Sequence, residues 1–449
     1  MNPFKAYDIR GQVPQELNTR LAYRIGQAYA QVFRPRCLVV GRDVRLESPA
    51  LAQTLSEGLN TAGVDVIDIG LCGTEEVYFQ TFQRQGDGVD GGIMVTASHN
   101  PKGYNGMKLV GPGARPISGD NGLLAIRDLA LADSPLAQAA QPGQTRAEPD
   151  KSEYIQHLLG YIDTDALRPL KILANPGNGP AGLVLRLLQP HLPFVIDCIQ
   201  AEPDGQFPQG VPNPLLPENR SLTAQAVVAS GADLGIAWDG DFDRCFLFDA
   251  QGRFIEGYYL VGLLAEMMLA KHPGSRIIHD PRLTWNTIEQ VQQAGGVPIQ
   301  CKTGHAFIKQ RMREEDAVYG GEMSAHHYFR DFAYCDSGMI PWLLIAELLS
   351  RSGQSLAQQV EARMAAYPCS GEINYRVSDA AAVIERVRAH FAPQALHQDS
   401  VDGLSLEFAH WRFNLRSSNT EPLLRLNLET RGQQADLGQC LAELEGLIL

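Results

Sequence analysis

Apolar runs of strand length alternate with amphipathic segments of helical length along most of the sequence. The first stretch shows the order helix, strand, helix, strand, at residues 17–33, 37–40, 49–62 and 64–69. Consecutive parallel strands need a crossover, which is usually a helix, and the helices then cover both faces of the sheet. The sequence therefore predicts a mostly parallel sheet between two layers of helices.

The same alternation recurs twice, around expected strands at residues 170–174 and 234–238 and then at 276–279 and 317–319. After residue 370 a strand and a helix are followed by consecutive strands, which is typical of an α+β domain. The polar stretch at residues 132–150 is predicted to be a surface linker. We thus expect an α/β protein with three successive doubly wound-like mixed α/β domains and a small C-terminal α+β domain. The predicted boundaries are residues 1–148, 149–250, 251–367 and 368–449.

The first polar motif follows the apolar run at residues 93–95, where Pro101 prevents a regular continuation. This places Ser98 on a loop at a strand end, where α/β sheets usually carry their chemistry. His99 lies beside it and Lys108 adds positive charge nearby, which suits a hydroxyl that meets phosphate. From the local pattern alone, a polar turn with an incidental serine is about as good an interpretation.

The second motif contains three alternating carboxylates, Asp239, Asp241 and Asp243. Alternate residues of an extended segment point the same way, so the three can converge on one cation, and oxygen-only ligands suit Mg²⁺. A calcium-binding EF-hand is excluded, because Arg244 and Ala250 stand where that loop needs glycine and glutamate. A solvated acidic turn is the remaining alternative, although the aromatic residues in this segment disfavour it.

The third motif is a pair of glycines followed by Glu322, Ser324 and His326. Glycines allow the backbone to approach a ligand closely, and the glutamate and serine can bind the hydroxyls of a polyol such as a sugar. His326 can transfer protons near neutral pH, and His305 is a second candidate. A single histidine is more often structural than catalytic, but its glycine-flanked cluster favours His326.

The fourth motif begins with Arg416, whose guanidinium can bind phosphate with two parallel hydrogen bonds. Ser418, Asn419 and Thr420 follow, and their side chains and backbone N–H groups could complete a phosphate cradle. The alternative is an ordinary turn between two strands.

Together and in this order, the four motifs resemble the α-D-phosphohexomutase superfamily over essentially the whole chain, and within it the bacterial phosphomannomutase/phosphoglucomutase branch. The matching segments are residues 96–101, 239–244, 321–324 and 416–422. The resemblance implies four domains around a central cleft, each contributing one loop. Phosphoglucosamine mutases usually carry glutamine at the position of Met323, so this form of the sugar loop is the one expected for mannose and glucose phosphates. Relatives that act on both sugars often carry lysine at the position of Arg282, which leaves the preference between them open.

The resemblance also implies an activity, the reversible interconversion of hexose 1-phosphate and hexose 6-phosphate. The reaction would pass through a phosphoserine and a hexose 1,6-bisphosphate, which serves as intermediate and activator. One Mg²⁺ per chain would be held by Ser98, Asp239, Asp241 and Asp243. The implied catalytic residues are Ser98, His99, Lys108, Arg244, His305 and His326. The implied substrate-binding residues are Tyr7, Arg10, Arg282, Glu322, Ser324, Arg416, Ser418, Asn419 and Thr420.

Other functions remain open at this level. A Mg²⁺-dependent sugar phosphatase would also use a phosphoserine, and a phosphoglucosamine mutase would share the architecture. A sugar-phosphate-binding protein without activity would be expected to have lost one of the four motifs, and none is visibly damaged.

Composition narrows the class of partner. The chain has 449 residues and a formal net charge of -13, which argues against nucleic acid as its main ligand. Its eight cysteines are scattered without a C-x-x-C pair, as in reduced cytoplasmic proteins. The longest apolar run, residues 339–349, is interrupted by Pro341 and Glu347 and predicts a buried helix rather than a membrane span. We expect a cytoplasmic monomer that binds small sugar phosphates, with no apolar signal segment at its start and no nucleic-acid or membrane partner.

Overall fold

The computed structural model describes residues 2–417, 423–432 and 436–449. The chain forms two compact units. The first contains Met1–Phe254 and His326–Gly353, and the second contains Ile255–Ala325 and Gln354–Leu449.

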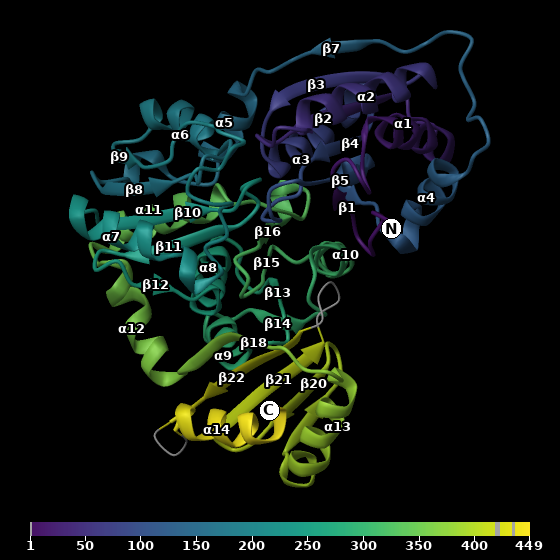
Figure 1. Ribbon diagram of the computed structural model, residues 1–449. Helices are drawn as coiled ribbons and strands as arrows, with labels where there is room; N and C mark the ends of the chain where they lie inside the picture. The colour runs from purple at the N-terminus through teal and green to yellow at the C-terminus, as the bar shows by residue number, and fades with distance from the viewer. Residues whose placement is uncertain (1, 418–422, 433–435) are drawn as a thin grey trace. The chain divides into compact units, whose positions relative to one another are not determined.

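The first sheet of the first unit is mixed but mainly parallel (Figure 1). Its strands are β1 (Ile9–Gln12), β2 (Cys37–Arg42), β3 (Asp65–Leu71), β4 (Val89–Val95), β5 (Tyr104–Gly111), β6 (Arg115–Pro116) and β7 (Thr145–Ala147). Their order is β1-β5-β4-β2-β3-β7, with β6 paired to β5. Strands β4, β2, β3 and β7 are parallel, whereas β5 is antiparallel to both β4 and β1.

Helices cover both faces of this sheet, as predicted. They are α1 (Thr19–Phe33), α2 (Ser48–Thr61), α3 (Thr74–Gln83) and α4 (Leu123–Leu131). Leu38 and Val40 of β2 point into a core shared with α1, α2 and α4. Val39, which lies between them, points into a second core shared with α3. This alternation is the period of two expected of a strand buried on both faces.

One expectation for this region is wrong. The segment at 132–150 is not only a linker, because it contains β7, which pairs with β3 at the sheet edge. All three residues of β7 are exposed, so the strand has no alternating apolar pattern in the sequence. The loop that follows β2 is largely interior, because Asp43 and Arg45 are both buried.

The second sheet of this unit has the order β12-β11-β10-β8-β9. Its elements are α5 (Ser152–Leu159), β8 (Lys171–Asn175), α6 (Ala181–Leu188), β9 (Val195–Cys198), α7 (Ser221–Ser230), β10 (Leu234–Trp238), β11 (Cys245–Asp249) and β12 (Phe254–Ile255). The unit also contains the hairpin β16 (His327–Phe329) and β17 (Cys335–Asp336), followed by α11 (Ile340–Ser352). Helix α11 is the predicted buried helix, and Pro341 lies in its first turn, where its missing N–H costs nothing.

The second unit begins with a third α/β stretch. Its elements are α8 (Gly257–Lys271), β13 (Arg276–His279), α9 (Trp285–Gln293), β14 (Val297–Gln300), α10 (His305–Glu315), β15 (Tyr319–Gly321) and α12 (Leu356–Ala366). Strand β13 lies between β14 and β15 and is parallel to both. The strand expected at 317–319 starts two residues later than predicted.

The C-terminal part of this unit is an antiparallel sheet with two helices, as predicted for an α+β domain. Its elements are β18 (Cys369–Tyr375), α13 (Ala380–Phe391), β19 (His397–Asp399), β20 (Leu404–Glu407), β21 (Trp411–Ser417), β22 (Leu424–Thr430) and α14 (Leu437–Ile448). The strand order is β18-β22-β21-β20-β19. Val387 and Phe391 of α13 and Leu444 of α14 share one core with Phe413 and Leu426 of the sheet.

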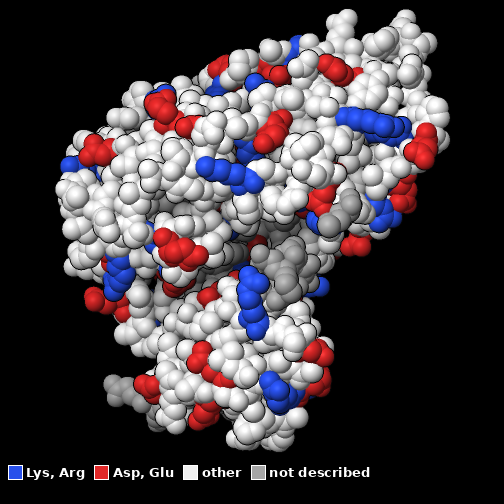
Figure 2. Space-filling model, in the orientation of Figure 1, with Lys and Arg blue, Asp and Glu red and all other residues white. Residues whose placement is uncertain are grey.

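The surface and the helix lengths bear on the class of protein. On the face drawn in Figure 2, basic and acidic side chains are interspersed rather than gathered by sign. Across the residues that the structure describes, no helix combines the length and apolar character that crossing a bilayer requires.

Candidate active site

The Ser98 hydroxyl lies at the centre of a polar cluster in the first unit. Ser98 follows β4 with a positive φ of 49° and is buried. Its Oγ donates to Asp239 Oδ2 at 2.8 Å and lies 3.0 Å from His99 Nδ1. A Cβ added to Gly240 would lie 2.4 Å from the Ser98 carbonyl oxygen, so only glycine allows the serine loop and the acidic loop to approach this closely.

A buried arginine holds the serine loop in this conformation. Arg45 donates to the carbonyl oxygens of Ser98 at 2.8 Å, Asn100 at 2.6 Å, Pro101 at 3.1 Å and Tyr104 at 3.0 Å. Such carbonyls in an irregular loop need donors, and one guanidinium supplies them. Sequence reasoning missed Arg45, because its partners are more than 50 residues away in the chain.

The three carboxylates among the four predicted metal ligands converge, as the sequence suggested. Carboxylate oxygens of Asp239, Asp241 and Asp243 all lie within 4.8 Å of one another, and all three residues are buried. Lys108 Nζ donates to Asp241 at 2.6 Å and to Asp243, and Arg244 Nε donates to Asp239 at 2.7 Å.

The acidic cluster fits a cation. The Oδ1 atoms of Asp239, Asp241 and Asp243 are buried and have no hydrogen-bond partner among the residues that the structure describes. Unpaired buried carboxylate oxygens are costly, and a hard divalent cation with oxygen ligands would satisfy all three. The donor set therefore matches Mg²⁺, and the structure already brings it together.

The surroundings shift the pKa values of the titratable groups in this cluster in different directions. Burial raises the pKa of Asp241, but the ion pair with Lys108 outweighs it and the net shift is downward. For Asp243, burial and the neighbouring Asp241 charge both raise the pKa. Burial and the adjacent Arg244 guanidinium lower the pKa of His99 well below its usual value, so this imidazole is neutral at physiological pH. The Nδ1 atom of a neutral His99 can accept a hydrogen bond from Arg244 Nη2, which lies 2.6 Å away.

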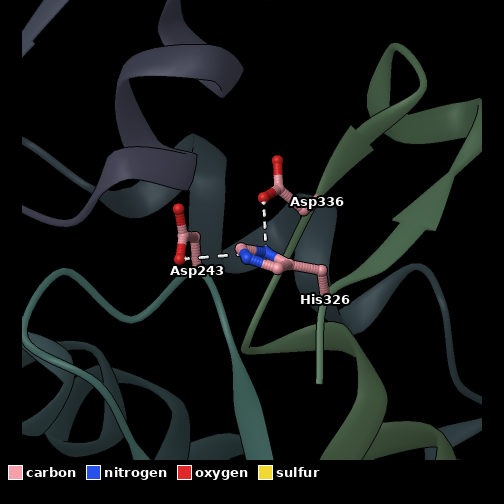
Figure 3. A group of neighbouring side chains, drawn as sticks. All are labelled: Asp243, His326 and Asp336. Carbon is pink, nitrogen blue, oxygen red and sulfur yellow. Dashed lines mark hydrogen bonds and ion pairs between the residues drawn. The ribbon is translucent and has the colours of Figure 1, made fainter. Parts of the chain in front are cut away.

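His326 lies in the same unit between two carboxylates (Figure 3). Its Nδ1 is 2.9 Å from Asp336 Oδ2 and 4.0 Å from Asp243 Oδ1. Asp336 ends β17, which pairs with β16 directly after His326. The sequence predicted His326 but missed Asp336, because their proximity depends on this hairpin. A carboxylate on Nδ1 fixes the ring orientation and the tautomer, as in catalytic histidines.

Helix α3 connects the metal loop with the segment that follows Asp336. Thr74, its first residue, donates its hydroxyl to Asp241 Oδ2 and its N–H to the Asp241 carbonyl. The next residue, Glu75, is fully buried. It accepts hydrogen bonds from Tyr154 at 2.5 Å, from the Ser337 hydroxyl at 2.8 Å, and from the N–H groups of Gly338 and Met339. A single carboxyl group thus links α3, α5 and the start of α11.

Glu75 should make the stability of the protein depend on pH. Burial raises the pKa of Glu75 from 4.5 to about 8, so the folded chain keeps this proton over a range in which the unfolded chain has lost it. Because the folded state binds the extra proton, stability decreases as the pH rises from about 5 to about 8, by up to about 1.4 kcal/mol per pH unit. Glu75→Gln mimics the protonated form and should remove this component.

The check is the thermal unfolding midpoint of both proteins between pH 5 and pH 9. We expect the midpoint of the wild type to decrease relative to that of Glu75→Gln up to about pH 8 and to run parallel above it. Glu57→Gln, on the exposed face of α2, is the control and should follow the wild type. Parallel curves for wild type and Glu75→Gln over the whole range would show that Glu75 does not titrate in this way.

The N-terminal candidates lie beside the serine loop. Arg10 Nη1 donates to Asn100 Oδ1 at 2.6 Å, and its Nη2 donates to Asp8 at 2.6 Å. Tyr7 is half-buried and precedes β1 by two residues. The structure thus brings Arg10 to the loop that contains Ser98.

The sugar-loop candidates come together in the second unit. Arg282 Nη2 donates to Asp280 at 2.8 Å and to Ser324 Oγ at 3.1 Å, and lies 3.6 Å from Glu322 Oε1. Asp280 also accepts from the N–H of Met323 at 2.8 Å, so it positions both the arginine and the loop. Sequence reasoning missed this role of Asp280.

His305 lies next to Gly304, which forms a hydrogen bond with the same loop. Glu322 Oε1 accepts from the N–H of Gly304 at 3.0 Å, and His305 is the first residue of α10. Glu322, Ser324, Arg282 and the start of α10 therefore form one group.

The phosphate-cradle candidate Arg416 lies in β21 of the second unit, one residue before the strand ends. It is buried and donates to Glu372 Oε2 at 2.9 Å. Ser418, Asn419 and Thr420 lie outside the described residues.

Comparisons with known proteins agree with this geometry. Models of the phosphoglucomutase/phosphomannomutase α/β/α domains I, II and III match residues 1–133, 152–252 and 256–367, and the model of the C-terminal domain matches residues 372–447. A protein named "Phosphohexose mutases" from Xanthomonas campestris pv. campestris is 63% identical over 446 residues, which cover 99% of this chain and 98% of that protein. A phosphomannomutase from Salmonella montevideo is 61% identical over 435 residues, which cover 96% of this chain and 95% of that protein. A solved phosphoglucomutase/phosphomannomutase family protein from Burkholderia thailandensis has a TM-score of 0.88 at 32% identity and covers 99% of this chain and 96% of that one.

Proposed function

This chain belongs to the phosphoglucomutase/phosphomannomutase family, and from that premise we propose that it reversibly interconverts hexose 1-phosphates and hexose 6-phosphates. We propose mannose phosphates as substrates, and glucose phosphates as well. One observation carries the proposal: the buried Ser98 hydroxyl bonds to Asp239, inside a cluster of carboxylates that each keep one oxygen unpaired. A nucleophile beside a divalent-cation site is the arrangement that phosphoryl transfer needs.

In the proposed reaction, Ser98 Oγ carries a phosphoryl group. The 6-hydroxyl of a hexose 1-phosphate attacks that phosphorus, so a new P–O bond forms to the sugar while the bond to Ser98 Oγ breaks. The product is a hexose 1,6-bisphosphate. After it turns around, Ser98 Oγ loses its proton and attacks the phosphorus at carbon 1, so a P–O bond forms to the serine while the P–O bond to the oxygen on carbon 1 breaks. That oxygen takes up a proton, which leaves hexose 6-phosphate. The same steps in reverse give the 1-phosphate.

Asp239, Asp241, Asp243 and the oxygen of Ser98 would hold one Mg²⁺ per chain. The ion, when bound, neutralises charge on the transferring phosphoryl group. Lys108 and Arg244 hold positive charge in the same cluster, since they bond to these aspartates. His99 lies on the Ser98 hydroxyl and can accept its proton when the serine acts as nucleophile.

We propose His326 as the group that takes the proton from the attacking sugar hydroxyl and returns it in reverse. Its support is the pair with Asp336, which orients the ring and stabilises the imidazolium formed on proton uptake. His305, at the start of α10 beside the sugar loop, is the second candidate.

Sugar and phosphate recognition is proposed for the second unit. Glu322 and Ser324 would bind sugar hydroxyls, and Arg282 would hold Ser324 and add positive charge. Arg416 would bind the phosphate that is not being transferred, together with Ser418, Asn419 and Thr420. Tyr7 and Arg10 would contribute from the N-terminal segment. The support is the convergence of Arg282, Glu322 and Ser324 around Asp280.

We also propose that the four domains end near the predicted boundaries, at residues 1–148, 149–250, 251–367 and 368–449, and that the enzyme acts as a monomer. All eight cysteines lie in the described part of the chain and none of them forms a disulfide, which supports a reducing compartment such as the cytoplasm.

A coupled assay tests the proposed substrates. Mannose 1-phosphate, glucose 1-phosphate and glucosamine 1-phosphate are compared by kcat/KM at saturating Mg²⁺ with a trace of hexose 1,6-bisphosphate. We expect turnover of the first two and poor turnover of the third, because Glu322 and Ser324 can reach two adjacent hydroxyls without requiring one configuration at carbon 2. If glucosamine 1-phosphate gave the highest kcat/KM, the substrate class would be wrong, although a mutase would remain.

A further inference from the structure

Three arginines of the second unit converge on one carboxylate, Glu372 in β18. Arg416 Nη2 lies 2.9 Å from Glu372 Oε2, and Arg282 Nη1 lies 3.6 Å from the same oxygen. Arg425 Nη1 lies 3.6 Å from the other oxygen, Oε1. The Glu372 side chain is only 9% exposed, so these charges interact with little screening by water.

This carboxylate satisfies the arginines only in part. The Nε atoms of Arg282 and Arg416 are buried, and no group in the described part of the chain forms a hydrogen bond with them. Arg416 Nε lies 4.0 Å from Oδ2 of Asp402, which is beyond hydrogen-bond distance. A phosphate dianion offers three oxygens and more charge than a carboxylate, so it matches a group of guanidiniums better than Glu372 does.

The pKa shifts of Glu372 and Arg416 reflect the charges that surround them. Burial raises the pKa of Glu372, but Arg282, Arg416 and Arg425 outweigh it and lower the pKa, so the side chain is ionised near neutral pH. Burial and repulsion from Arg282 lower the pKa of Arg416. Arg282 also pairs with Asp280 at 2.8 Å, whereas Arg416 depends on Glu372 at 2.9 Å and on the more distant Asp402 at 4.0 Å to offset the repulsion from Arg282.

We propose that Glu372 is a resident counter-ion that competes with the substrate phosphate for Arg416 and Arg282. It holds the arginines together when the site is empty, and an incoming phosphate displaces it from Arg416. Because the carboxylate returns when the phosphate leaves, Glu372 weakens phosphate binding and favours the release that the turning bisphosphate requires. This rests on the proposed function in one respect, the assignment of Arg416 to the phosphate that is not transferred.

The test uses inorganic phosphate as a competitive inhibitor of mannose 1-phosphate turnover. Glu372→Gln keeps the shape and removes the charge, so it should lower the inhibition constant roughly tenfold at low ionic strength, and less at high salt. KM for the hexose phosphate should fall in parallel without an increase in kcat. Glu443→Gln, the same change on the exposed face of α14, should leave the inhibition constant unchanged.

Two further variants separate the possible outcomes. In the Arg416→Ala variant, the additional change Glu372→Gln should not lower the inhibition constant of phosphate, because the arginine for which Glu372 and phosphate compete is absent. Glu372→Asp keeps the charge but moves it away from Arg416 by one methylene, so this variant should still fold. It should lower the inhibition constant of phosphate only about twofold to threefold. Unchanged or weaker phosphate binding in both Glu372 variants would overturn the proposal, as would equal tightening in the Arg416→Ala background.

The same measurements distinguish this proposal from the proposed function. If Arg416→Ala weakens phosphate inhibition while Glu372→Gln does not strengthen it, Arg416 binds phosphate and only the role of Glu372 is wrong. If Arg416→Ala leaves both phosphate inhibition and KM unchanged, the assignment of Arg416 itself is wrong.

Discussion

Ser98→Ala should lower kcat by about four orders of magnitude or more, because a covalent path through Ser98 Oγ cannot proceed without that oxygen. The rest of the cluster should remain, since Arg45 holds the loop through backbone carbonyls and not through the serine side chain. The measurement is kcat for mannose 1-phosphate with saturating hexose 1,6-bisphosphate, together with intact-protein mass. Wild type should contain a fraction heavier by one phosphoryl group, and Ser98→Ala should not.

Ser56→Ala is the matched control. Ser56 is buried in the same unit, and its hydroxyl donates only to the Ala52 carbonyl one helical turn earlier. This variant should keep near-normal turnover. Near-normal turnover in Ser98→Ala would show that the serine does not carry the phosphoryl group.

Asp241→Asn should give the second large effect, a decrease in kcat of about two to three orders of magnitude together with weaker Mg²⁺ activation. The substitution removes one charge from the three carboxylates while keeping the shape. The amide oxygen can still accept from Lys108 and Thr74, so the thermal unfolding midpoint should change little. The measurement is the Mg²⁺ dependence of kcat after complete chelation, which should abolish wild-type activity.

Asp128→Asn controls for the change in net charge. Asp128 is an exposed residue of α4 that pairs only with its neighbour Arg127, so its variant should keep the wild-type Mg²⁺ dependence. Full activity of chelated wild type, or a wild-type Mg²⁺ dependence in Asp241→Asn, would contradict a metal site at these aspartates.

The sequence predicted well those features that are local. The α/β alternation predicted the parallel core, because the central residues of β2, β3 and β4 are buried on both faces and are mostly apolar. The polar motifs were found because each one interrupts or directly follows an apolar strand. The alternation of Asp239, Asp241 and Asp243 was enough to predict that their carboxylates converge.

What the sequence did not reveal depends on partners far away in the chain. Arg45, Glu75 and Glu372 look like ordinary surface charges, yet each is buried or nearly so against groups more than 40 residues distant. Strand β7 was missed for the opposite reason, because an exposed edge strand of three residues has no apolar pattern. The periodicity of apolar residues shows which face of a strand or helix is buried. It does not show which buried charged residues contact one another.

The most direct test of phosphoryl transfer through Ser98 follows the phosphate itself. Enzyme labelled with radioactive phosphate on Ser98 is mixed with a modest excess of mannose 1-phosphate and quenched within one turnover and after several. The label should leave Ser98 and appear first in hexose 1,6-bisphosphate and then in mannose 6-phosphate, with little inorganic phosphate. Label released mainly as inorganic phosphate would identify a phosphatase, and label that stays on Ser98 while mannose 6-phosphate forms would contradict a phosphoserine mutase.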